Sequence, residues 1–417
     1  MNENYKLSPL GLIPSDWEVK ELIDFCIKSK RAIVDGPFGS NLKTEHFKTE
    51  GIPVINSSFV TDLVFNASEY VYVDKELFQR EIRSKVVPGD IIMAKIGARC
   101  GSSAILPSNH PVSILSGNSL KISIDENENS IPFVWYLLIN VYQKNQFKDC
   151  KSTGAQPAIS TPALKRLKFK RPPLLEQRAI ANILGLMDCA INANIQLITQ
   201  KILRKKWLIQ NLLTGKKRLK GFHEEWKGIH IRDAANEVSI RNKGDKQLTV
   251  LSCTKYDGLV PSLEYFGRKI FADDLSTYKI VPKNHFAYAT NHIEEGSIGY
   301  QEILDEALIS PMYTVFKTDS SINDTFFYKL VKSHKLVYQY QNRMEGSIDR
   351  RGGLRWDAFS IIKIRIPSFE EQTAIAQVLQ AADKEIQLLK ARTDKLKEQK
   401  KGMMQLLLTG KKRLKIK

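Results

Sequence analysis

The sequence predicts a mixed α/β (α+β) protein with an internal pseudo-two-fold repeat, in which two globules alternate with two long helices. Three observations predict this order. The nine-residue string LLTGKKRLK stands at Leu212 to Lys220 and again at Leu407 to Lys415. A long proline-free stretch with apolar residues at coiled-coil spacing precedes each copy. The remaining sequence is rich in short apolar or alternating runs between Gly, Pro, Asn and Asp turns, which is typical of strands.

The first predicted globule comprises residues 1–171. Its strand-like runs include GIPVINSS, GDIIMAKIG and SLKISI, and PFVWYLLINVY is an aromatic helix candidate. The run LKRLKFKRPP is interpreted as a last strand that leads into the following helix. With 417 residues, of which 42% are hydrophobic, the chain is long enough to bury more than one core.

Residues 172–220 are the first predicted long helix, and residues 367–417 are the second. A shift of 195 positions, the distance from Leu212 to Leu407, aligns the two segments without a gap. Identical pairs are Glu176/Glu371, Gln177/Gln372, Ile180/Ile375, Leu184/Leu379, Asp188/Asp383 and Ile191/Ile386. Each helix, roughly 37 residues and ~55 Å long, is expected to pair with the other. The predicted seam consists of Ile191, Ile195, Ile198, Ile202, Ile209 and Leu212 in the first helix, and Ile386, Leu389, Leu396, Met403 and Leu407 in the second.

The repeated string is interpreted as a helix stop that is used twice. Gly215 and Gly410 are placed to adopt left-handed caps. The Lys-Lys-Arg that follows each glycine suits the negative end of a helix dipole, as the Glu-Gln near each first turn suits the positive end.

The second predicted globule comprises residues 221–366. Its strand candidates are QLTVLSC, NHFAYATN and PMYTVFK, and TFFYKLVKSHKLVYQY is its aromatic helical segment. Its tail, FSIIKIRIPS, matches the tail of the first globule position for position, whereas the rest of the two globules matches weakly. Helices with a clear repeat, joined to globules that match weakly, indicate two different recognition domains rather than one domain used twice.

The charge of the chain predicts a polyanionic partner. Lys and Arg total 63 against 45 Asp and Glu, a formal charge of +18. Nucleic acid is favoured over a membrane, because no apolar run approaches the ~18 residues that a spanning helix needs. The first residues lack the pattern of a signal peptide, and the five cysteines are scattered, which favours a reducing cytoplasm over a disulfide framework or a zinc site.

Known catalytic motifs are missing from the sequence, so the chain is expected not to be an enzyme. It has no Pro-Pro-aromatic methyltransferase signature, no phosphate-binding G-x-x-x-x-G-K loop and no G-x-S-x-G elbow. The segment NHIEEG is expected to form a turn rather than a metal site. We expect no cofactor or metal in this chain.

The order of globule, P-x-x-x-E-Q-x-A-I-A helix ending in LLTGKKRL, second globule and second such helix resembles the specificity (S) subunit of type I restriction–modification systems. The stretch DGPFGSNLK, from Asp35 to Lys43, is also similar to a segment of such subunits. The resemblance implies two target-recognition domains at opposite ends of an antiparallel coiled coil. Each would read one half of a bipartite double-stranded DNA site, and the helices would set the gap. It also implies binding to two adenine-N6 methyltransferase (M) subunits, which carry S-adenosylmethionine, and to restriction (R) subunits that use ATP and Mg²⁺.

Eleven residues in glycine-rich or polar loops are candidates for DNA contacts, because arginine and lysine bind guanine edges or phosphates and glutamine binds adenine. They are Lys43, Lys95, Arg99, Lys151 and Gln156 in the first globule, and Arg241, Lys243, Arg343, Arg350, Arg351 and Arg355 in the second. For each, the alternative is a solvated cation or a phosphate contact without sequence information. The two glycines of DRRGGLR are expected to let the backbone approach DNA closely.

A second function remains open, namely a basic coiled-coil scaffold or architectural DNA-binding protein without sequence specificity. Salt dependence cannot separate the two functions, because phosphate binding produces it in both. A specificity ratio can. If the chain is an S subunit, the helix ends and their LLTGKKRL caps are the expected docking surfaces for M subunits.

Overall fold

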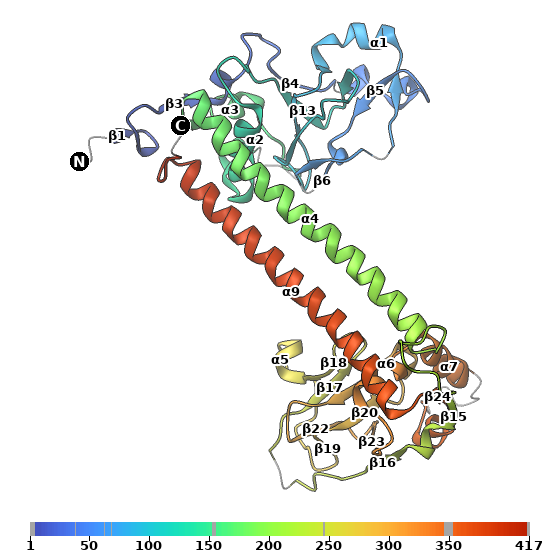
Figure 1. The fold of residues 1–417 in the computed structure, drawn as a ribbon. Coiled ribbons are helices and arrows are strands. Elements are labelled where there is room, and N and C mark those ends of the chain that lie inside the picture. Colours follow the sequence, from blue (N-terminus) through green and yellow to red (C-terminus); the bar gives the residue numbers. More distant parts are fainter. Residues whose placement is uncertain are drawn as a thin grey trace. The chain divides into compact units, whose positions relative to one another are not determined.

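A computed structural model describes residues 5–37, 39–61, 63–67, 69–151, 156–244, 247–345 and 353–414. The chain forms two compact units, unit 1 with residues Met1–Asn194 and Arg392–Lys417, and unit 2 with residues Ile195–Ala391. Each unit contains one globule and parts of both long helices (Figure 1). Because the unit boundaries fall inside the helices, the division of the sequence into four segments stays a prediction.

The long helices are α4 (Leu174–Leu212) and α9 (Phe369–Leu407), each of 39 residues and therefore about 58 Å long. In unit 1 the first turns of α4 share a core with the end of α9, and in unit 2 the end of α4 shares a core with the first turns of α9. The pairing is therefore antiparallel within each unit, which confirms the predicted fold class. Among the described residues, no helix offers a stretch long and apolar enough to cross a membrane.

Burial along the helices confirms part of the predicted seam and corrects one position. Four of the predicted residues are buried: Ile191, Leu212, Ile386 and Leu407. Ile195, however, is 43% exposed, so its place in the seam was wrongly predicted. The inward face at this turn passes through half-buried Asn194, three residues after Ile191, which leaves Ile195 beside the seam.

Two ion pairs between the helices follow the repeat. In unit 1 the Nζ of Lys400 lies 2.6 Å from the Oδ1 of Asp188, and in unit 2 Lys205 pairs with Asp383. The two aspartates are equivalent in the repeat, as are the two lysines, so each carboxylate pairs with the lysine of the other copy. Burial alone would raise the pKa of Asp383, but hydrogen bonds from Lys205 and Lys329 lower it overall.

The repeated string ends both helices as predicted. Gly215 and Gly410 both have φ +71°, the left-handed conformation of a helix cap. At Gly410 a side chain would also collide, because a Cβ would lie 2.6 Å from the Cδ of Pro14.

Beyond the caps, the arginine of each string binds a buried glutamate of the other copy. In unit 1, Arg413 donates to both carboxylate oxygens of Glu176, at 3.0 and 2.6 Å. In unit 2, Arg218 donates to both oxygens of Glu371, at 2.6 and 2.5 Å. Both glutamates are 1% exposed. The string is thus a helix stop and also half of a reciprocal bidentate contact, which explains why the chain carries it twice.

The globule of unit 1 contains two four-stranded sheets, in the orders β11-β10-β13-β4 and β8-β5-β12-β9. All neighbours are antiparallel except β5 and β12. The strands are β4 (Ile33–Asp35), β5 (Ile52–Ile55), β8 (Tyr72–Val73), β9 (Lys85–Val86), β10 (Ile91–Ala94), β11 (Ser103–Ile105), β12 (Ser113–Leu115) and β13 (Ser119–Ile122). Smaller antiparallel pairs are β1 (Tyr5–Ser8) with β2 (Gly11–Pro14), β3 (Glu18–Glu21) with β14 (Lys168–Arg171), and β6 (Val60–Thr61) with β7 (Val64–Phe65). The short helices are α1 (Lys75–Arg80), α2 (Ile131–Gln143) and α3 (Thr161–Lys165).

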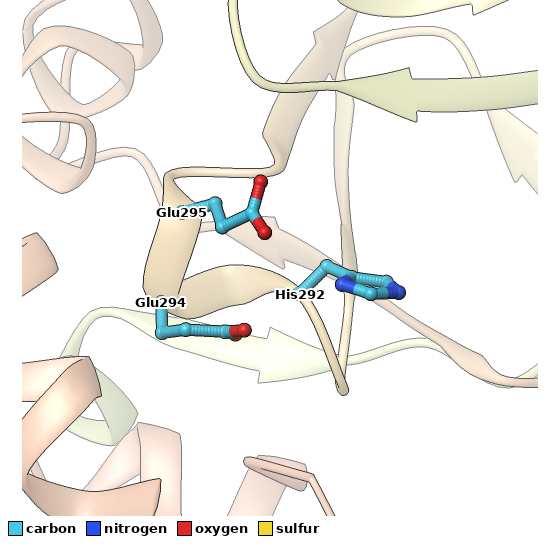
Figure 2. A group of neighbouring side chains, drawn as sticks. All are labelled: His292, Glu294 and Glu295. Carbon is cyan, nitrogen blue, oxygen red and sulfur yellow. The ribbon is translucent and has the colours of Figure 1, made fainter.

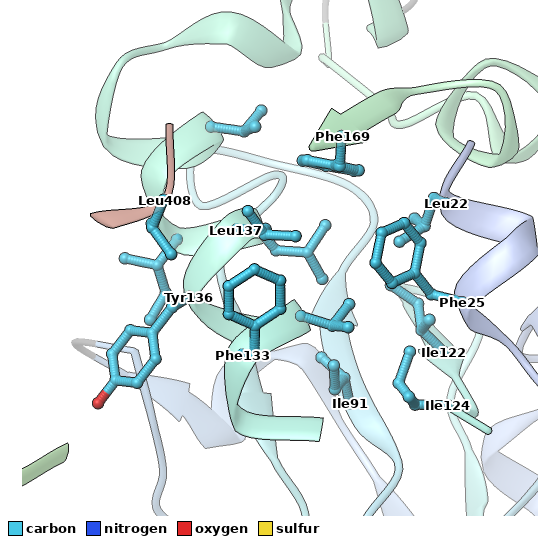
Figure 3. Close-up of a cluster of buried hydrophobic side chains, with 14 of the residues drawn as sticks. Leu22, Phe25, Ile91, Ile122, Ile124, Phe133, Tyr136, Leu137, Phe169 and Leu408 are labelled. Atoms are coloured by element: carbon cyan, nitrogen blue, oxygen red, sulfur yellow. The ribbon is translucent and has the colours of Figure 1, made fainter. Parts of the chain in front are cut away.

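The main core of unit 1 lies between α2 and the first of these sheets. Figure 3 shows Phe133 and Leu137 of α2 beside Ile91 and Ile122 of the sheet. Leu408, which follows α9, belongs to the same core. The segment directly after α9 is therefore part of the core of the first globule.

The globule of unit 2 contains one antiparallel four-stranded sheet in the order β16-β23-β20-β21. The sheet strands are β16 (Ala235–Glu237), β20 (His285–Ala289), β21 (Ile298–Gln301) and β23 (Tyr313–Thr318). Further antiparallel pairs are β15 (Lys227–His230) with β24 (Lys363–Ile366), β17 (Leu251–Thr254) with β18 (Gly258–Pro261), and β19 (Lys279–Pro282) with β22 (Glu306–Ile309). The helices are α5 (Ser262–Phe266), α6 (Asp324–Val331), α7 (His334–Glu345) and α8 (Trp356–Ser360), and the core is rich in phenylalanine.

The repeat extends into the backbone contacts of the globules. The predicted tail strands β14 and β24 pair with the equivalent strands β3 and β15. The amide of Ile159 donates to the carbonyl of Lys95 at 2.9 Å, and the amide of Leu354 donates to the carbonyl of Thr290 at 2.8 Å. The two donating residues are 195 positions apart in the sequence, and so are the two accepting residues. The two globules therefore share a backbone plan where their sequences match only weakly.

The glutamine of each Glu-Gln pair connects a globule to its long helix by hydrogen bonds. Gln177 accepts from the amide of Ser130 at 2.9 Å and donates to the carbonyl of Pro172 at 3.0 Å. Gln372 accepts from the amide of Asn323 at 2.9 Å and donates to the equivalent proline carbonyl at 3.1 Å. Both amide side chains thus hold the start of an aromatic helix, α2 or α6, beside the start of α4 or α9.

Gln177→Ala is expected to lower the free energy of unfolding of unit 1 by roughly 2–3 kcal/mol, because buried backbone groups lose their partners. Gln177 is 0% exposed. Hydrogen exchange of the unit 1 amides would measure the loss. The exposed neighbour Arg178 supplies the control, since Arg178→Ala should change the same quantity by about 0.5 kcal/mol or less. Equal effects of the two substitutions would contradict the role of Gln177.

Candidate nucleic-acid interface

In unit 1, Asp35 connects the end of β4 with Lys95 and with Thr161, which follows the loop of Lys151 and Gln156. It ends β4 and begins the DGPFGSNLK stretch. Its carboxylate accepts from Lys95 Nζ at 2.8 Å and from Thr161 Oγ1 at 2.7 Å. A Cβ on Gly36 would lie 1.9 Å from the carbonyl oxygen of Ser116, so only glycine fits after Asp35. These contacts fix the positions of the loops around the end of β4.

Four of the five predicted residues of unit 1 belong to two loops that the fold brings together. Residues 95–101 follow β10, and their backbone bonds to residues 157 and 159. Arg99 and Gln156 are exposed, and Lys151 is half-buried beside Ile159. Lys95 is half-buried and ion-paired with Asp35. At least part of its charge is therefore neutralised by Asp35 within the globule. DNA contact by Lys95 stays a prediction.

Lys43 belongs to a different part of the same globule. It precedes a short 3-10 helix (Thr44–His46) and pairs with Glu45 at 3.3 Å, with 53% of its side chain exposed. Its neighbour Leu42 packs against the core of the second sheet. DNA contact by Lys43 stays a prediction, and no described contact links it to the loops around Asp35.

In unit 2, Arg241 and Arg355 are both near Lys279, which the sequence analysis missed. Arg241 forms a backbone bridge with Lys279, and Arg355 lines a cavity of about 410 Å³ together with Lys279 and Trp356. Burial lowers the pKa of Lys279, Glu237 opposes this effect and Arg241 adds to it. Lys279 is the first residue of the apolar strand β19. Its positive charge is the only feature of the sequence that could have indicated a contact with DNA.

The other predicted residues of unit 2 are dispersed. Lys243 is exposed at φ +53°, and Arg343 is exposed in the last turn of α7. Arg350 and Arg351 lie outside the described residues. The close approach that Gly353 permits is to the chain itself, because a Cβ there would lie 2.6 Å from the carbonyl oxygen of Thr290. A close approach of the backbone to DNA in this segment stays a prediction.

The loop after the central strand carries opposite charge in the two globules. After β10 it holds Lys95 and Arg99, whereas the equivalent loop after β20 holds His292, Glu294 and Glu295. Figure 2 shows these three side chains around the 3-10 turn Ile293–Glu295, which confirms the predicted turn. Their ligand atoms lie within 4.8 Å of one another, and His292 and Glu295 are exposed. Equivalent loops of the two globules thus present side chains of opposite charge.

Three comparisons relate the chain to known proteins. The profile of the family described as the type I restriction modification DNA specificity domain matches residues 14–204 and 236–398. The type I restriction enzyme MjaVIII specificity subunit of Methanocaldococcus jannaschii is 25% identical over 443 residues, covering 99% of this chain and 97% of that protein. The putative type I restriction enzyme MjaX specificity subunit of the same organism is 27% identical over 445 residues, with the same coverage.

Solved structures share the fold. The S subunit of a type I restriction–modification system from M. genitalium superposes with a TM-score of 0.56 at 16% identity, covering 98% of this chain and 99% of that one. The HsdS subunit from Thermoanaerobacter tengcongensis gives 0.55 at 15% identity, covering 95% and 98%. At such identities the likeness concerns the fold.

Proposed function

Because the chain belongs to the family of type I restriction modification DNA specificity proteins, we propose that it reads a bipartite double-stranded DNA site with two unlike globules. One observation carries this proposal. Equivalent loops on one backbone plan hold Lys95 and Arg99 in unit 1 but Glu294 and Glu295 in unit 2. Cations recognise guanine edges or phosphates and carboxylates accept from cytosine, so equal loops with opposite charge suit different half-sites. A scaffold without sequence choice would gain nothing from this difference.

In this proposal the chain directs enzymes rather than acting as one. Two adenine-N6 methyltransferase subunits would bring S-adenosylmethionine, and restriction subunits would bring ATP and Mg²⁺. The assembly would work in the cytoplasm, with the chain itself carrying no cofactor. α4 and α9, each about 58 Å long, can cover one turn of B-DNA, ~34 Å. Their capped ends, which carry the repeated string, are the proposed docking surfaces for the methyltransferase subunits.

The test is to co-express the chain with the methyltransferase subunit of its own genome in a methylation-free host and to map N6-methyladenine. One motif of two short unlike halves around a fixed gap would support the proposal. Methylation without a motif, from a folded complex, would instead support the basic scaffold.

If each globule reads one half-site, substitutions in one globule should reduce discrimination at one half-site only. The double variant Arg241→Ala, Arg355→Ala should reduce discrimination at one half-site by at least about tenfold, because each base contact is worth ~1–3 kcal/mol. Methylation rates on sites with single mismatches would measure it.

The matched control is Arg99→Ala, Gln156→Ala in unit 1. It should reduce discrimination at the other half-site by a similar factor and leave the first unchanged. Effects of both double variants on one and the same half-site would refute the assignment, and so would unchanged discrimination in both.

A further inference from the structure

The N-terminal hairpin β1–β2 exposes three leucines on one small sheet. Leu7 is 83% exposed, Leu12 is 60% exposed and Leu10 is 39% exposed. In the same hairpin Ile13 is buried in the core of unit 1, so the outward leucines are not needed for its packing. Clustered large apolar side chains on a charged protein indicate an interaction surface.

The hairpin is held firmly against the end of α9. Tyr5 donates from its hydroxyl to the carbonyl of Gly410 at 3.0 Å. Lys170 Nζ donates to the carbonyl of Leu12 at 2.9 Å and to that of Thr409 at 3.1 Å. The leucines are thus presented on an ordered support, which lowers the entropic cost of binding a partner.

A cavity of about 540 Å³ opens between the hairpin and the helix end. Leu10 and Leu12 line it, and Lys170 and Lys411 contribute its cations. No acidic residue is among the residues that line it. Burial, and then the charge of Lys411, lower the pKa of Lys170. The cavity is therefore complementary to an apolar side chain flanked by carboxylates.

A second copy of the chain fits this surface poorly. The chain carries a formal charge of +18, and two such hairpins would bring their lysines together. DNA also fits poorly, because phosphates gain nothing from exposed leucines. A protein segment with apolar and acidic residues fits both features.

The identical string in unit 2 has different surroundings. There Gly215 lies against Trp226, whose ring atoms would be 3.4 Å from an added Cβ. Lys216, the equivalent of Lys411, lines a cavity of about 920 Å³ together with Lys206, His334 and Lys335. The described residues that precede Trp226 form turns rather than a hairpin. Two helix ends of identical sequence thus offer an apolar surface in one unit and a basic cleft in the other.

We propose that the β1–β2 hairpin, with Lys170 and Lys411, docks a protein segment that presents an apolar side chain beside carboxylates. Resting on the proposed function, this partner is a methyltransferase subunit, which binds at unit 1 through a contact that unit 2 does not offer. The two docking positions for this subunit are consequently unequal in affinity.

Native mass spectrometry of the full chain, titrated with its methyltransferase subunit, tests this proposal by resolving species with one and two bound subunits. The double variant Leu7→Ser, Leu12→Ser should raise the Kd of one of the two binding steps at least about tenfold, as expected for anchors at an interface centre. Lys411→Glu should weaken the same step. The control for the leucines is Ile303→Ser, because Ile303 is 78% exposed in unit 2. The control for the charge is Lys317→Glu, because Lys317 is exposed in β23 of unit 2 and lies outside the repeated string.

Each outcome decides the proposal. The proposal is supported if both unit 1 variants weaken one of the two binding steps and both controls leave the two Kd values unchanged. Unchanged binding by the unit 1 variants overturns it, as does an equal effect of Lys317→Glu and Lys411→Glu. A change only in self-association of the chain also overturns it, because the occupant is then a second copy. If the unaltered chain binds no methyltransferase subunit, the proposed function fails first, and a methylation map without a motif would show the same failure independently.

Discussion

Arg413→Ala is expected to destabilise unit 1 by about 3 kcal/mol, the lower end of the range for breaking a buried ion pair. Glu176, its partner, is 1% exposed and would lose its bidentate partner in the core. The lower end applies because Arg413 is 39% exposed, so water can reach part of the vacated space. One hydrogen bond to Glu176 would survive, from the indole of Trp17 at 3.0 Å. Hydrogen exchange of the unit 1 amides would measure the loss.

The repeat supplies the control for this prediction. Arg218→Ala removes the equivalent contact to Glu371 and should destabilise unit 2 while leaving exchange in unit 1 unchanged. Adding Glu176→Gln to Arg413→Ala should recover part of the stability of unit 1, since the unpaired charge is then absent. A loss below about 1 kcal/mol in Arg413→Ala would mean that the contact acts like an ordinary surface ion pair.

Asp35→Ala is expected to reduce discrimination at one half-site by at least about tenfold, ~1.4 kcal/mol, without any contact of Asp35 with DNA. The substitution removes the acceptor shared by Lys95 and Thr161, so the loops with Arg99 and Gln156 lose a fixed position. Methylation rates on matched and mismatched sites would measure the ratio.

A surface acid of the same globule is the control. Glu45 pairs with Lys43 and is 66% exposed, so Glu45→Ala should leave discrimination unchanged. Asp35→Ala should also leave the other half-site unchanged. Equal losses at both half-sites would point to general instability of the protein rather than to loop placement.

The parts predicted from the sequence are those in which local pattern and repeat coincide. Helix lengths, left-handed caps at Gly215 and Gly410, and the tail strands β14 and β24 all follow from spacing and turn chemistry along one segment. The misplacement of Ile195 shows the limit of this approach. An apolar residue one position beside the seam satisfies the spacing rule as well as one inside it.

The parts that the sequence analysis did not predict depend on contacts between distant segments. Lys95 looked like a surface cation, because its partner Asp35 is 60 residues away. The hairpin at Tyr5–Pro14 rests on Gly410 across nearly the whole chain. Lys279 was not among the candidates, because only the fold places it beside Arg241 and in one cavity with Arg355. Periodicity contains no information on such pairings.

The reciprocal contacts of Glu176 with Arg413 and of Glu371 with Arg218 also limit how the sequence of the chain can change. Each glutamate finds its arginine in the other copy of the repeat, so neither copy can change this pair alone without loss. Residues of the globules, by contrast, can change without removing either pair, because all four partners lie in the repeated segments. The two ion pairs thus constrain the repeated segments and leave the sequences of the globules free to differ.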